Sequence, residues 1–121
     1  MKMFSTLCLT VLLCSCYSIP EIEGFDKEAW TQEMVSCSDS KIEYAELILE
    51  HEDKLLGEGQ AEVKALLGPP SENELYLRNQ KFFYYDLTLN SDSCEVLFQR
   101  LSLRFDALDR VSEIMIIEGD N

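Results

Sequence analysis

The hydrophobic period of this chain changes at Pro69-Pro70, and that change constrains the fold more than any other feature. Before it, "GQAEVKALLGPP" spaces Val63, Leu66 and Leu67 as on one face of a helix, which the prolines then end. After it, "VLFQRLSLRFD" alternates with a period of two, as a strand with one buried face does. The sequence therefore predicts helices before the prolines and strands after them.

Two more helical patterns lie upstream. In "SKIEYAELILEHEDKLLG", Ser40 and Glu43 form a capping box, and Gly57 can end the helix in the left-handed conformation. "DKEAWTQEMVS" predicts a short helix capped by Asp26, with Trp30 as a core residue. We therefore expect two main helices after a short one.

Three strand patterns follow the prolines, namely "KFFYYDLTL", "VLFQRLSLRFD" and "VSEIMIIE", the last two joined as a hairpin by "ALDR". Leu97, Leu101, Leu103 and Phe105 share one face of the second pattern. The predicted fold is α+β, with two main helices packed on one face of a small three-stranded antiparallel sheet.

The amino terminus has the pattern of a signal peptide. Lys2 precedes an apolar run that is shorter than the roughly 20 residues of a membrane-spanning helix. The run ends in "LCSC", in which Leu13, Ser15 and Cys16 resemble the bacterial lipobox. We expect a signal peptide at 1–15, a tether lipidated on Cys16 at 16–25, and an α+β domain at 26–121. The alternative is an uncleaved anchor, which would leave the same domain at a membrane.

The lipobox resemblance also implies a location. Lipoprotein processing leaves three acyl chains on the cysteine, more than the two membrane signals that suffice for stable anchoring. Tyr17, rather than an aspartate that favours the inner membrane, follows Cys16. The expected location is the periplasmic side of the outer membrane.

Cleavage would leave two cysteines without lipid, Cys37 and Cys94. Thiols in an oxidising compartment usually pair, so we expect a disulfide between them. The alternative is two unpaired cysteines. Zinc is not expected, because His51 is the single histidine and no C-x-x-C motif survives cleavage.

Charge and motifs exclude several classes of function. The chain has 23 acidic and 10 basic residues, a formal charge of -13 that would repel nucleic acid. The "EHED" segment lacks the spacing of a metalloprotease, and "NSDSCE" lacks the glycine and final glutamate of a calcium loop. We therefore expect no enzyme activity, no cofactor and no metal.

The second face of the sheet is the better candidate for function. If the alternating leucines point to the helices, Phe98, Arg100 and Arg104 point away from them, beside Phe82 and Tyr84. Aromatic residues and arginines are enriched where proteins bind each other. Our hypothesis is a docking face for another envelope protein, and the alternative is that Phe82 and Tyr84 merely pack together.

Three segments, "VKALLGPP", "FFYYDL" and "LSLRFDALDRVSEIMI", together resemble the SmpA/OmlA family, the small lipoprotein component of the outer-membrane β-barrel assembly machinery. The resemblance covers about residues 57 to 117, with Asp109 where the family often has glycine. It implies a membrane-anchored binding or scaffolding module in envelope assembly. The same architecture also occurs in tandem in a secreted β-lactamase inhibitor, so the alternative is a tethered inhibitor or binder of a periplasmic enzyme.

Overall fold

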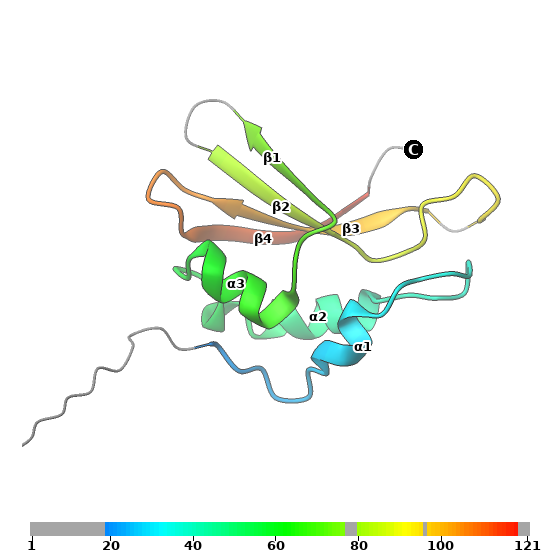
Figure 1. Cartoon of the computed structure of the whole chain (residues 1–121), viewed down its shortest axis with the longest axis horizontal. Helices are drawn as coiled ribbons and strands as arrows, with labels where there is room; N and C mark the ends of the chain where they lie inside the picture. The colour runs from blue at the N-terminus through cyan, green and yellow to red at the C-terminus, as the bar shows by residue number, and fades with distance from the viewer. Residues whose placement is uncertain (1–18, 77–79, 96, 119–121) are drawn as a thin grey trace, which may run out of the picture.

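The computed structural model describes residues 19–76, 80–95 and 97–118. Within these residues the helical elements are α1 (Lys27–Thr31), α2 (Ile42–Glu50), the 3-10 helix η1 (Glu52–Lys54) and α3 (Gln60–Leu67). The strands are β1 (Glu72–Tyr76), β2 (Gln80–Asp86), β3 (Gln99–Phe105) and β4 (Val111–Glu118). Figure 1 shows the strands as one layer, with the α-helices together on one of its faces.

The described strands form one antiparallel sheet, in which the spatial order β1-β2-β3-β4 is also the chain order. The α+β class is as expected, but the predicted three-stranded sheet is wrong, because β1 adds a fourth strand. This strand begins with Glu72, Asn73 and Glu74, residue types that are depleted in strands. It pairs on one side only, with β2, so its position depends on that partner rather than on its own propensity.

The long helix expected from Ser40 to Gly57 is also shorter than predicted. Ser40 forms a bridge with Thr88, and its hydroxyl accepts a hydrogen bond from the Ile42 amide. The helix therefore begins later, at Ile42, and it ends at Glu50 before the separate turn η1. Gly57 has the expected positive φ, 90°, and its amide donates to Val111, which draws the chain toward β4.

The core lies between the helices and the sheet. Leu101, Leu103 and Phe105 face it with no exposed area, as predicted, whereas Leu97, predicted on the same face, precedes β3 and is 63% exposed. The Phe105 ring packs edge-on against Phe83, with 4.7 Å between the centroids. The helical side supplies other fully or almost fully buried residues, namely Trp30, Ala45, Ile48, Leu55, Val63 and Leu67.

The end of α3 is held by side chains from other elements. Trp30 Nε1 donates to the carbonyl of Leu67, and the Tyr85 hydroxyl donates to that of Gly68, each at 2.9 Å. The last carbonyls of a helix have no partner within it, so these two donors satisfy groups that burial would otherwise leave unpaired. Trp30 is 2% exposed, which confirms it as a core residue.

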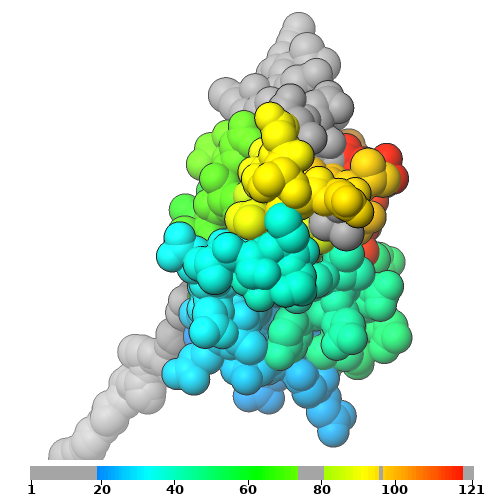
Figure 2. Space-filling view, turned by 90° about the vertical axis from the view of Figure 1, so that its right-hand side faces the viewer, coloured from blue at the N-terminus to red at the C-terminus, as the bar shows by residue number. Residues whose placement is uncertain are grey.

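Cys37 and Cys94 form the predicted disulfide, with 5.3 Å between their Cα atoms. The bond joins the α1–α2 connection to the β2–β3 connection, which lie together at one end of the molecule. In Figure 2 the cyan and yellow segments of these connections lie against each other. The disulfide therefore fixes the helical layer to the sheet at a place where both layers end in loops.

The β3–β4 turn explains why glycine would suit position 109. Asp109 has a φ of 67°, a conformation that glycine adopts without steric cost. The carboxylate of Asp106 accepts hydrogen bonds from the amides of Leu108 and Arg110, which closes the turn. Gln60 Nε2 donates to the Asp109 carboxylate at 2.7 Å, which ties the turn to α3.

Candidate functional site

The face of the sheet opposite the helices is called here the outer face. In Figure 1 no helix lies on this side of the sheet. Cross-strand pairing defines three of its rows, in which neighbours lie on adjacent strands. The rows are Glu72, Tyr84, Ser102 and Met115; then Phe82, Arg104 and Glu113; and finally Asp86, Arg100 and Ile117.

Arg100 is the most constrained side chain of this face. Its guanidinium lies 3.1 Å from carboxylate oxygens of both Glu72 and Asp86, so it links β3 to β2 and β1. It also lies over two rings, at 4.8 Å from the Tyr84 centroid and 5.1 Å from that of Phe98. The Arg100 side chain is only 17% exposed, so its main role is to hold the outer face together.

Phe82 and Tyr84 stack on each other, with 5.9 Å between centroids and 5° between planes. Both side chains remain partly accessible. This mutual packing was the alternative to a docking role, and it is present. It does not exclude docking, since a stacked pair presents its exposed edges as a rigid apolar surface.

Arg104 is the more accessible arginine, with 35% of its side chain exposed. Its Nε lies 3.3 Å from Glu113, which is an ion-pair distance without hydrogen-bond geometry. The Nε atom is buried but both side chains are partly exposed, so solvent screens the pair and its contribution to stability is small. Arg104 can therefore reorient toward a partner at low cost.

The sequence analysis placed Phe98 on the accessible face of the sheet, but its side chain is buried. It precedes β3 and is 5% exposed, under the guanidinium of Arg100 and outside the main core cluster. Met115, which sequence reasoning missed, is 44% exposed on the same face. Its signal was the alternation within "VSEIMIIE", which places Met115 opposite to Ile114 and Ile116.

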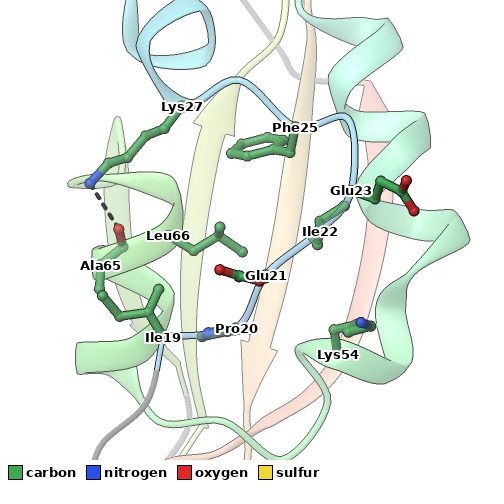
Figure 3. Close-up of a pocket in the computed structure, with 10 residues that line it drawn as sticks. All are labelled: Ile19, Pro20, Glu21, Ile22, Glu23, Phe25, Lys27, Lys54, Ala65 and Leu66. Carbon is green, nitrogen blue, oxygen red and sulfur yellow. Dashed lines mark hydrogen bonds between the residues drawn. The ribbon is translucent and has the colours of Figure 1, made fainter.

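A separate pocket of about 620 Å³ lies where the segment 19–25 runs along the helical layer. Figure 3 shows Phe25 and Leu66 turned into it, with Lys27 bonded to the carbonyl of Ala65 at 2.8 Å. Among the described residues, the lining also includes two carboxylates, Glu21 and Glu23, and the ammonium group of Lys54. The apolar side chains of the lining, flanked by charged ones, suit an apolar or amphipathic ligand.

A smaller pocket of about 170 Å³ contains Lys41, Tyr85 and Asp86. Burial lowers the pKa of Lys41 from its ordinary value, although Asp86 acts in the opposite direction. Burial raises the pKa of Tyr85 well above its ordinary value. Because the Tyr85 hydroxyl is already bonded to Gly68, this group supports structure rather than proton transfer.

Cys16 lies outside the described residues, so the structure adds nothing about lipidation. Across the described ranges, no helix has the length and apolar character needed to cross a membrane. The same part of the chain contains no cluster of three or more histidine, cysteine or acidic residues suited to a metal ion.

No family model matches this chain, and no curated protein or solved structure gives a significant match. The resemblance to the SmpA/OmlA family therefore stays a prediction. The outer face, with its accessible arginine and stacked rings, is the candidate functional site.

Proposed function

We propose that this chain is a non-catalytic binding module, anchored to the outer membrane by lipid on Cys16, whose outer face docks another envelope protein. The observation that carries the proposal is the composition of that face. On a chain with a formal charge of -13, a sheet face that no described helix covers has the accessible Arg104 beside two stacked aromatic rings, with Arg100 held beneath by its own contacts. Proteins use these residue types at the centres of their interfaces.

The outer face divides into a fixed part and an accessible part. Arg100 and Phe98 are the fixed part, because the ion pairs and ring contacts of Arg100 are made within the domain. Arg104, Phe82 and Met115 are the accessible part, available to touch a partner. A rigid base under accessible side chains lowers the entropy cost of binding.

The tether limits where the partner can be. Ile22 is 6% exposed and belongs to the core, only six positions after Cys16 in the sequence. Six extended residues span at most roughly 20 Å. The domain would therefore stay close to the membrane, and its partner would be embedded in the membrane or lie at its surface.

A site-specific photocrosslinker tests the docking face in intact cells. Placed at Met115, it should yield one dominant adduct with an envelope protein, identified by mass spectrometry. Arg104→Glu should reduce this adduct at least about tenfold, the loss expected for a contact of about 1.4 kcal/mol. Arg110→Glu is the matched control, because it makes the same charge change at an exposed residue of the β3–β4 turn.

The result that would overturn the docking face is an adduct unaffected by Arg104→Glu, or equal adducts from a crosslinker at the exposed residue Val35.

Lipidation is tested separately by labelling cells with a fatty-acid analogue, which should mark the wild type and not Cys16→Ala. The phenotype separates the two roles. Loss of an assembly module should raise sensitivity to many detergents and antibiotics, whereas loss of a tethered inhibitor should change one enzyme activity.

A further inference from the structure

The two edges of the sheet differ in what they offer to another chain. An edge strand has unpaired amides and carbonyls, which proteins usually protect with short strands or charged residues. β1 is protected in this way, since it has five residues and begins Glu-Asn-Glu. β4 has eight residues, and its positions 114–117 are all apolar.

The edge of β4 already pairs with other backbone at its first residue. The Gly57 amide donates to Val111 at 2.8 Å, and the Val111 amide donates to Glu58 at 2.9 Å. Gly59 continues this contact as a bridge to Arg110. The edge can therefore accept an antiparallel segment on the side away from β3.

This pairing stops after Val111, because the chain preceding Gly57 belongs to η1 and the turn after it. Among the described residues, no other backbone pairs with positions 112–118 on the side away from β3. These seven residues are called here the open edge. It is long enough for a partner strand of ordinary length.

The charge around the open edge selects the kind of partner. Glu113 and Glu118 lie on β4, where Glu113 is half-exposed and already paired with Arg104, and Glu118 is exposed. α2 is the helix that packs against β4, and its exposed face carries Glu43, Glu46 and Glu50. An added strand would lie beside the glutamates of β4 and extend the sheet over the layer that contains the acidic helix α2, so basic side chains would be attracted to this position and acidic ones repelled.

The strand pattern sets the rest of the partner's chemistry. Ile114 and Ile116 face the core side of the sheet, while Met115 lies on the outer face. An added strand would extend both faces, so its apolar residues would continue the core side. A second copy of this chain is disfavoured, because it brings the same formal charge of -13.

We propose that the open edge of β4 pairs with an extended segment of another protein in which apolar residues alternate with lysine or arginine. This goes beyond docking on the outer face, since it uses backbone hydrogen bonds at a sheet edge. It does not depend on the lipid anchor, and its contact is the backbone edge of β4 rather than the side chain of Arg104, which enters only as the ion-pair partner of Glu113. Failure of either proposal therefore leaves the other intact.

Hydrogen exchange tests the proposal on the full-length chain in mild detergent. The probes are two synthetic peptides of about ten residues, the length of a longer strand, in which valine alternates with lysine in one and with glutamate in the other. At about ten times its Kd, the lysine peptide should slow exchange of amides within residues 112–118 by about tenfold. The glutamate peptide should leave them unchanged.

A double variant tests the charge argument. Glu113→Lys with Glu118→Lys should weaken binding of the lysine peptide at least about tenfold. Glu21→Lys with Glu23→Lys is the matched control, because it makes the same charge change at exposed residues on the amino-terminal segment, and binding should persist.

Three outcomes would overturn the proposal: no protection by the lysine peptide, protection of β1 in place of β4, or equal protection by both peptides. Protection of 112–118 without peptide, together with a dimer mass, would show that a second copy occupies the edge and would also overturn it.

Discussion

The indole of Trp30 and the carbonyl of Leu67 are joined by a 2.9 Å hydrogen bond inside the core. This bond links α1 to the end of α3, 37 residues later in the chain. Together with the bond from Tyr85 to Gly68, it provides donors for the last carbonyls of a helix whose end is buried.

Trp30→Phe should lower the free energy of unfolding by about 2–4 kcal/mol. The loss combines a buried carbonyl without its donor, about 1–3 kcal/mol, with a cavity left by the smaller ring. Urea unfolding followed by circular dichroism measures it. A loss below about 0.5 kcal/mol would mean that the Leu67 carbonyl finds another donor.

Tyr85 should make the stability fall at alkaline pH. Burial raises the pKa of its hydroxyl in the folded state above the ordinary value of 10.0. The folded chain then keeps a proton that the unfolded chain releases, so this contribution is complete below pH 10.0 and is lost as the pH rises further.

Tyr85→Phe should therefore be less stable than the wild type at about pH 8, since the Gly68 carbonyl loses its donor. Between about pH 8 and pH 11, however, its free energy of unfolding should fall by less than that of the wild type. Urea unfolding at the two pH values measures the difference. Tyr44→Phe is the control, because it removes the hydroxyl of a partly exposed tyrosine. Equal slopes for wild type and Tyr85→Phe would contradict the argument.

The disulfide should be the largest single covalent contribution to stability. Cys37 and Cys94 are separated by 57 residues, and closing a loop of that size is worth about 4 kcal/mol in the chain-entropy model. Replacing both cysteines with serine should lower the melting temperature by an amount close to the effect of reducing the wild type. An unchanged melting temperature in both cases would show that the bond is incidental.

Arg100→Lys should loosen the side of the sheet that contains β1. Lysine cannot bridge two carboxylates while stacking on Tyr84 and Phe98, so the ion-pair network is lost. The Glu72 carboxylate is half-exposed and contributes little, which limits the expected loss to about 1–2 kcal/mol.

In Arg100→Lys, the rate of hydrogen exchange should then increase over that of the wild type more in β1 than in β4. Arg104→Lys is the matched control, because it makes the same substitution at an exposed ion pair with Glu113 and should cost less than about 0.5 kcal/mol. Equal effects of the two variants would show that Arg100 is not the link between the strands.

The parts of the fold predicted from sequence are those whose local pattern agrees with their packing. Leu101 and Leu103 alternate in a strand buried on one face, and Asp26 caps α1 through the amides of Glu28 and Ala29. Cys37 and Cys94 were identifiable because cleavage would leave two thiols without lipid.

The parts that sequence reasoning missed depend on tertiary partners. β1 forms because β2 offers it an edge, and the predicted start of α2 fails because Ser40 is drawn into a bridge with Thr88. At the candidate site, the sequence was enough to predict that Arg100 lies on the sheet face away from the helices. Its bonds to Glu72 and Asp86 could not, because they require the register of three strands.

The agreement between spatial order and chain order in the sheet has a kinetic consequence. Each strand pairs with its neighbour in sequence, so the sheet can grow one hairpin at a time, with short loops at β1–β2 and β3–β4 and a longer one, residues 87–98, at β2–β3. Mostly local pairing favours rapid folding. The step that requires long-range contacts is then the docking of the helices on the sheet. It brings distant residues such as Trp30 and Tyr85 into contact and completes the hydrophobic core.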